Sequence, residues 1–189
     1  GAAFHSEIEN LPEMYEGRQA SLFGAFEDVK KEHGMEDASM MVALSKLKGI
    51  MVEMMLPGIL RWLRKLRPSA VVYCPIMNQE AAISAKVLGI PSVAVLTTAG
   101  PGSLVKAIDG LFRSEGLEPK DVMRMRETYA PLRESIERLN AKYGSLFSLK
   151  AFYEPLGKLE AVIQSTLTLV TTCEALQDPM TPELAQAYK

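Results

Sequence analysis

The sequence predicts an α/β protein in which a Rossmann-like parallel sheet is flanked by helices, with a high helix content. Two β-rich apolar runs, at 70–74 and 92–96, enclose an Ala-rich stretch at 79–88 that has helical character. Strand, helix and strand joined by short loops form a right-handed βαβ unit of a parallel sheet. A further β-branched run at 166–172 predicts a third strand. The run at 70–74 is continuous, as expected for a strand buried on both faces, and we expect the other two strands to be buried as well.

The longest predicted helix precedes the first strand. Apolar residues recur with a period close to 3.6 over 38–66, as expected for a helix that buries one face. Ser39 is a suitable N-cap, and Pro68 ends the helix. Pro57 and Gly58 fall near its middle, where we expect them to kink or divide it.

The remaining elements are less regular. An apolar cluster at 2–4 predicts a short strand followed by a loop, and a weaker helix is expected over 17–33, with Gly34 as its stop. Further helices are predicted over 103–114, 118–128, 131–143 and 152–164. Residues 1–175 then form one domain, and the Pro-containing, polar residues 176–189 form a linker-like tail.

Length, charge and hydropathy exclude several classes of protein. The chain has 189 residues, with Lys+Arg 21 against Asp+Glu 23, and its isoelectric point is about 5.8. This length is sufficient to bury a core without disulfides. The balanced charge argues against a nucleic-acid binder that depends on bulk charge. Charged residues interrupt the apolar stretches, so no transmembrane span is expected.

Cysteines and histidines are few. Cys74 and Cys173 both end apolar runs, which predicts two buried free thiols in a reducing intracellular compartment. No Cys/His cluster has metal-binding spacing, and no metal or cofactor is expected. The chain starts at Gly1 without a signal pattern, so we interpret its N-terminus as processed or trimmed.

Candidate ligand residues follow the first two predicted strands. Ligands of open parallel sheets bind outside the carboxyl ends of the strands. Side chains suited to hold a polar small molecule there are those of Asn78, Gln79, Thr97 and Thr98. The alternative is that these loops are plain and that their polar groups cap the next helix. A weaker phosphate site would use Gly100, Gly102 and Ser103, although the dinucleotide motif requires a third glycine where Val105 stands.

No catalytic residue is identified. His33 lies in a polar segment, and His5 either faces a pocket or, as we favour, lies on the surface; a Ser-His-Asp arrangement has no support. Six methionines between Met35 and Met55 are interpreted as core, with an adaptable partner surface as the alternative. A basic amphipathic turn permits peripheral contact with anionic lipid, with a solvated helix end as the default; it comprises Arg61, Trp62, Arg64, Lys65 and Arg67.

The βαβ region resembles a known family. The run RPSAVVYCP…AAISAKVLGIPSVAVLTTAGPG is similar to the N-terminal, acceptor-side domain of UDP-glycosyltransferases of the GT-B fold, which follow the order long helix, basic-Pro-Asp strand, helix, LGIP, strand, Thr. The later PLRESIERLNAKYGSL and TLTLVTTCEALQDP resemble the next helix and the last strand of that domain, and 1–4 fit its early strand. The resemblance implies a GT-B half-domain.

Departures from the family pattern shape the expected function. The resemblance implies a catalytic histidine in a first β-α unit and a nucleotide-sugar domain, and this sequence has neither. Where the family often places an aspartate that orients the histidine, Cys74 and Pro75 stand. We therefore expect a pseudoenzyme that serves as a structural or accessory subunit of a larger protein complex. The alternatives are an acceptor-binding half, for a small neutral or lipid-like acceptor, completed by another chain, and a trimmed piece of such an enzyme.

Overall fold

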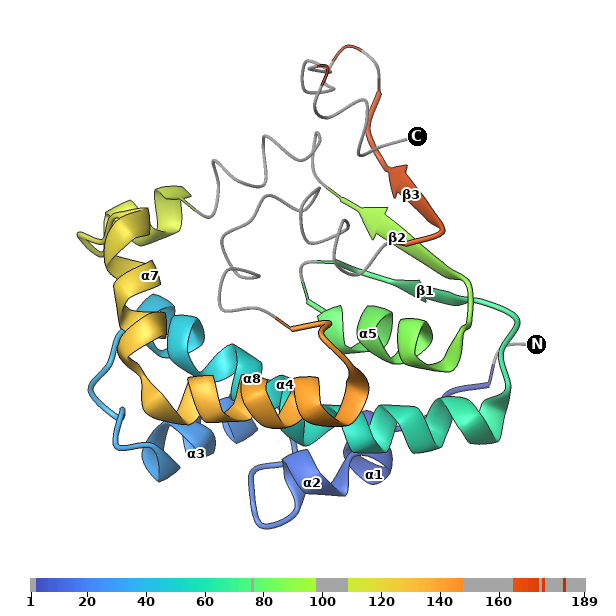
Figure 1. Ribbon diagram of the computed structural model, residues 1–189, viewed down its shortest axis with the longest axis horizontal. Helices are drawn as coiled ribbons and strands as arrows, with labels where there is room; N and C mark the ends of the chain where they lie inside the picture. Colours follow the sequence, from blue (N-terminus) through green and yellow to red (C-terminus); the bar gives the residue numbers. More distant parts are fainter. Residues whose placement is uncertain are drawn as a thin grey trace.

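The computed structural model describes residues 3–75, 77–97, 109–147 and 165–173, together with residues 175 and 182 (Figure 1). A further helical segment covers 109–114. The labelled elements are, in chain order, α1 (Glu7–Asn10), α2 (Pro12–Tyr15), α3 (Leu22–Glu32), α4 (Met40–Leu66), β1 (Val71–Tyr73), α5 (Gln79–Leu88), β2 (Ser92–Leu96), α7 (Pro119–Thr128), α8 (Ala130–Tyr143) and β3 (Leu167–Val170).

The sheet has the order β1-β2-β3, and both strand pairs are parallel. Val72 is in register with Val93, and Val93 with Leu167. The strand–helix–strand unit formed by β1, α5 and β2 is present as predicted, and the third predicted strand pairs with β2. The prediction of a helix-rich α/β protein with a parallel sheet is therefore confirmed.

The long helix α4 organises the molecule. Its N-cap is Ser39, whose Oγ accepts a hydrogen bond from the Val42 N–H at 3.4 Å. The helix has 27 residues and ends at Leu66; its C-cap, Arg67, has a left-handed backbone (φ 49°) and precedes Pro68. The helix runs unbroken through Pro57, so the expected division is wrong. At 1.5 Å per residue it is about 40 Å long, which brings it into contact with most other helices (Figure 1).

The Pro57-Gly58 pair marks a helix crossing instead of a break. A Cβ placed on Gly58 would lie 2.5 Å from Leu11 Cδ2 and 2.7 Å from the Asn10 carbonyl oxygen. The missing side chain therefore lets the junction of α1 and α2 contact the α4 backbone directly. A sequence pattern shows the helix-breaking residues but not the tertiary contact that makes the glycine necessary.

The N-terminal prediction requires a correction. Residues 3–6 have no regular structure, and the chain then enters α1, because the Ser6 Oγ accepts a hydrogen bond from the Glu9 N–H at 3.4 Å. The expected strand at 2–4 is therefore wrong over its described residues. The weaker helix predicted over 17–33 begins later, at Leu22, where Ser21 caps it. Its predicted stop is confirmed, since Gly34 has φ +62°.

The helices after β2 agree with the prediction where the structure describes them. The helix predicted over 118–128 is α7, and that over 131–143 is α8, which ends before Gly144 (φ +83°). Of the helix predicted over 103–114, residues 109–114 are helical. The predicted helix at 152–164 and nearly all of the predicted tail lie outside the described residues.

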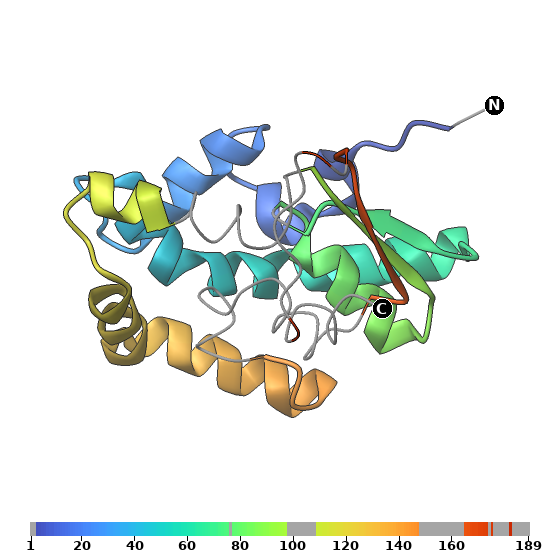
Figure 2. The ribbon, with the colours of Figure 1, turned by 90° about the horizontal axis from the view of Figure 1, so that it is seen from above.

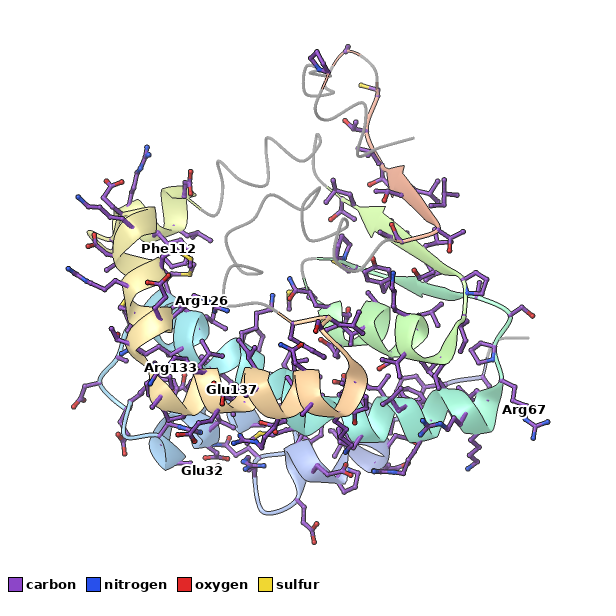
Figure 3. All side chains as sticks on the ribbon, in the orientation of Figure 1. Glu32, Arg67, Phe112, Arg126, Arg133 and Glu137 are labelled. Carbon is purple, nitrogen blue, oxygen red and sulfur yellow. The ribbon has the colours of Figure 1, made fainter. Side chains whose placement is uncertain are left out.

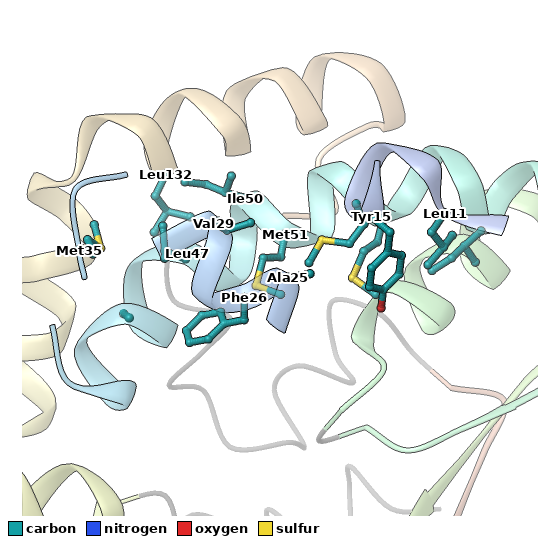
Figure 4. Close-up of a cluster of buried hydrophobic side chains, with 14 residues drawn as sticks. Leu11, Tyr15, Ala25, Phe26, Val29, Met35, Leu47, Ile50, Met51 and Leu132 are labelled. Atoms are coloured by element: carbon teal, nitrogen blue, oxygen red, sulfur yellow. The ribbon is translucent and has the colours of Figure 1, made fainter. Parts of the chain in front are cut away.

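The main core lies between helices. Figure 2 shows α4 between α3 on one side and α8 on the other. Val29, Ile50 and Leu132 contribute to this cluster from α3, α4 and α8 respectively (Figure 4). Four of the six methionines between Met35 and Met55 are buried, which favours the core interpretation; these are Met35, Met41, Met51 and Met55.

Only one face of the sheet is covered by described helices. Tyr73, Ala94 and Leu96 pack on α4 and α5, and Leu139 of α8 joins the same cluster. The opposite face, which we call the outer face, carries Val72, Val93, Val95, Leu167 and Leu169. Val72 is 67% exposed, Leu167 45% and Leu169 46%. The expectation that β1 is buried on both faces is therefore wrong, as is the expected burial of β3 at its outward positions.

Candidate functional site

The predicted ligand residues lie at the carboxyl edge of the sheet. Asn78 and Gln79 follow β1 and are half-buried, and Thr97 follows β2 and is exposed. Because β1 and β2 are parallel neighbours, the structure places these three residues at the same edge. The other predicted residues, Thr98, Gly100, Gly102 and Ser103, lie outside the described residues.

Asn78 does not play the capping role that the simpler interpretation assigns to it. It occupies the N-cap position of α5, but its side chain accepts no hydrogen bond from the helix. Its backbone N–H donates to the Cys74 carbonyl oxygen at 2.9 Å, which forms a tight turn after β1. The Asn78 Nδ2 then donates to Glu80 Oε1 at 3.3 Å. The amide therefore interacts with a carboxylate instead of the helix end.

Glu80 is the most unusual group at this edge. Its side chain is only 4% exposed, and burial raises the pKa of its carboxyl from 4.5 to about 7. Its own backbone N–H, the Asn78 amide and the Lys48 charge act in the opposite direction, while Glu7 raises the pKa further. A carboxyl with this pKa exchanges a proton near neutral pH.

Lys48 supplies the opposite charge from α4. It is half-buried, and desolvation lowers the pKa of its amine from 10.5 to about 8. The negative charge of Glu80 partly offsets this effect, whereas the positive charge of Arg126 adds to it. Glu80 and Lys48 therefore both titrate within about one unit of neutral pH. Each loses solvation by burial, and the opposite charge of the other offsets only part of that loss.

Arg126 connects the third element to this edge. Its side chain is buried, and its Nη1 donates to the Ser45 carbonyl oxygen one turn before Lys48. This bond holds α7 against α4. Cys74, at the end of β1, is half-buried and also acts on the Lys48 charge. We call Lys48, Cys74, Asn78, Glu80 and Arg126 the carboxyl-edge cluster.

Sequence reasoning identified only Asn78 of this cluster as a ligand residue. Glu80 stands in the first turn of α5, where a carboxylate is ordinary because it suits the helix dipole. Lys48 and Arg126 lie on helices predicted for their apolar periodicity. The one available signal was that Glu80 is the only acidic residue between Arg61 and Lys106 and begins an Ala-rich, otherwise apolar helix.

The two histidines each contact an aromatic side chain. His5 is exposed, as favoured from the sequence, and its ring meets Trp62 edge-on with centroids 5.8 Å apart. His33 Nδ1 lies 2.7 Å from the Tyr129 hydroxyl, with which it shares a hydrogen bond. Each histidine ring therefore has a structural partner, and neither is among the groups that act on the pKa of Glu80.

Thiol and metal chemistry are limited in the described part of the chain. Cys74 and Cys173 are both free, but Cys173 is exposed, so the expectation of two buried thiols is wrong. Cys173 follows β3, whose outer face is open. Within 3–75, 77–97, 109–147 and 165–173, no three His, Cys, Asp or Glu side chains are grouped to hold a metal ion.

Three comparisons with known proteins were negative. No family model, no curated protein and no solved structure matches it. Among the described helices, none is both long enough and apolar enough to cross a membrane.

Proposed function

We propose that this chain is a GT-B-type half-domain, similar to the acceptor-side half of a UDP-glycosyltransferase, that has no catalytic activity by itself. It acts as a structural or accessory subunit of a larger assembly. The observation that carries the proposal is the outer face of the sheet, where Val72, Leu167 and Leu169 are exposed and Val93 and Val95 are only half-buried.

The apolar character of the outer face comes from all three strands and not from a single residue. Side chains alternate between faces along a strand, and the parallel register aligns the outward positions of all three strands. Every outward position in the paired region is Val or Leu, namely Val72, Val93, Val95, Leu167 and Leu169. An apolar face that is built this consistently favours burial against another layer.

No described helix supplies that layer. The core residues under the sheet belong to α4, α5 and α8, and all of them contact the Tyr73 side. Parallel sheets are almost always covered on both faces. A partner polypeptide that packs on the outer face would leave the sheet covered on both faces, as in an ordinary α/β domain. Such a contact surface is what we expect of an accessory subunit.

The arrangement of side chains also supports a chain that does not catalyse alone. The chain has two histidines, and the structure places His5 beside Trp62 and His33 beside Tyr129. Where the resemblance implies an aspartate, the chain has Cys74, a half-buried thiol, and Pro75. A thiol there cannot hold a histidine in the way that a carboxylate does.

The oligomeric state of the isolated chain tests this proposal. We expect concentration-dependent association in light scattering, because the outer face is exposed without its partner. V72K/L169K, which places two charges on the outer face, should suppress that association. The matched control I8K/L111K changes two other exposed aliphatic residues and should not. A wild-type chain that remains monomeric at all concentrations contradicts the proposal, as does equal association by both variants.

A second candidate function is the acceptor-binding half of an enzyme completed by another chain that binds the nucleotide sugar. The carboxyl-edge cluster favours it, because Glu80 and Lys48 both exchange protons near neutral pH at the edge where sheet ligands bind. The partner would be isolated by co-purification and identified by mass spectrometry. Transfer from common UDP-sugars by the reconstituted complex would support this function, and absence of turnover would exclude it.

A further inference from the structure

The edge of the sheet opposite the carboxyl-edge cluster carries a concentration of positive charge. Both α4 and α5 end there, where the chain enters β1 and β2 (Figure 1). The exposed basic residues of these two helix ends are Arg64, Lys65, Arg67 and Lys86, which we call the basic edge. Figure 3 shows Arg67 projecting from the end of α4.

These charges are not compensated locally. Arg61, one turn earlier, forms an ion pair with Glu13. In contrast, no carboxylate in the described part of the chain lies within ion-pair distance of any basic-edge side chain. From residue 61 to residue 108 the sequence contains one acidic residue, Glu80, which is buried at the other edge. A helix end normally favours cations, but two adjacent helix ends here combine into one positive surface.

Apolar side chains lie within the same surface. Leu66, between Lys65 and Arg67, is 42% exposed, and Phe4 is 93% exposed. The contact between the rings of His5 and Trp62 holds residues 3–6 beside the last turns of α4. Trp62 is half-buried, and its indole Nε1 has no hydrogen-bond partner among the described residues. The surface therefore combines exposed cations, an exposed aromatic ring and an exposed aliphatic side chain.

We propose that the basic edge docks this chain on an anionic membrane surface. Lipid headgroups neutralise the four cations, while Leu66 and Phe4 enter the boundary between headgroups and acyl chains. An acidic protein or a nucleic acid would use the charges alone and leave the exposed apolar side chains without a role. This inference does not depend on the proposed half-domain function, because it concerns the opposite edge of the sheet and none of the outer-face residues.

The chain offers an internal probe of this docking. Trp62 is its single tryptophan and lies within the surface. With vesicles of phosphatidylcholine and phosphatidylserine, we expect co-sedimentation and a blue shift of the Trp62 emission, both weakened by added salt. Vesicles of phosphatidylcholine alone should produce neither effect.

Two charge-matched variants locate the contact. R64Q/K65Q/K86Q removes three basic-edge charges and leaves Arg67 in its left-handed cap. R113Q/K120Q/R133Q removes three exposed charges from the other end of the molecule, and Figure 3 shows Arg133 there on α8. Each basic residue near an anionic surface strengthens binding about fivefold. The first variant should therefore lose roughly a hundredfold in vesicle affinity, and the second should lose little.

Several results would overturn the docking proposal. These are no binding to phosphatidylserine vesicles, equal losses in both variants, or co-sedimentation without a Trp62 shift. Binding to a heparin column or to duplex DNA without vesicle binding would assign the charges to another class of partner. L66S, which retains all charges, should reduce the Trp62 shift while leaving thermal unfolding unchanged. An unaltered shift in L66S would contradict the insertion of that side chain.

Discussion

Gly58 and Leu11 approach so closely that a Cβ on the glycine would lie 2.5 Å from Leu11 Cδ2. The added Cβ would also lie 2.7 Å from the Asn10 carbonyl oxygen. A backbone atom moves away from such a contact less easily than the end of a side chain does. We therefore expect G58A to reduce the free energy of unfolding in urea by about 1–3 kcal/mol, as overpacked sites do.

A second glycine provides the control for that substitution. Gly110 belongs to the helical segment 109–114, and a Cβ there would meet nothing within 4 Å. G110A should leave the protein unchanged or stabilise it by up to about 1 kcal/mol, because alanine loses less backbone entropy in a helix. If G58A unfolds at the same urea concentration as the wild type, the close crossing of α1 and α2 over α4 is contradicted.

Leu132 tests whether α8 shares the main core. It is fully buried, contacts the cluster formed by α3 and α4, and lies against Gly49 (Figure 4). L132A should lower the free energy of unfolding by about 2–5 kcal/mol, since it leaves a cavity. L111A, which shortens an exposed leucine, should stay within about 0.5 kcal/mol of the wild type. Equal effects of the two substitutions would place α8 outside the core.

Glu80 predicts a pH dependence with a defined sign. Its pKa rises from 4.5 in the unfolded chain to about 7 in the fold, so the folded state retains the proton longer. Its stabilising contribution is present below pH 4.5 and is lost as the pH rises through 7, an effect of about 3 kcal/mol. E80Q should remove this decline in urea titrations between pH 4.5 and 7. E137Q, at an exposed position on α8, should keep it.

Lys48 predicts the opposite trend at higher pH. Burial lowers the pKa of its amine from 10.5 to about 8, so the unfolded chain binds more protons between these values. Stability should therefore increase as the pH rises from 8 toward 10. K48M should remove this increase, whereas K120M, at an exposed position on α7, should retain it. A wild-type curve that is flat above pH 8 would show that Lys48 is better solvated than its surroundings indicate.

Sequence periodicity was sufficient to predict the elements whose structure depends mainly on residues nearby in the sequence. The βαβ unit, α4, α7 and α8 follow from apolar spacing, caps such as Ser39, and stops such as Gly144. Periodicity failed where a long-range contact decides the local structure. Pro57 lies within the unbroken helix α4, and the next residue, Gly58, is required there because of Leu11, which lies far away in the sequence.

The sequence predicted where the candidate site lies in the fold but not most of the residues that form it. The parallel strands put Asn78 and Thr97 at one edge, as topology requires. The charged members Glu80, Lys48 and Arg126 come from three separate helices, and each alone reads as an ordinary surface charge. Their burial depends on how α4, α5 and α7 pack, which no local pattern encodes. For the same reason the runs at 70–74 and 166–172 indicated strands but not that the described helices would cover only one face of the sheet.

The strand order β1-β2-β3 has a consequence for how the molecule is completed. Both connections between strands advance in one direction, and the described helices along them contact the same side of the sheet. A parallel strand that followed β3 in the chain and paired beside β1 would reverse that direction of winding. Since crossovers are right-handed, its helix would then fall on the side of Val72. A single helix–strand unit after β3, on the order of 30 residues, would thus pair with β1 and cover the aliphatic face in one step.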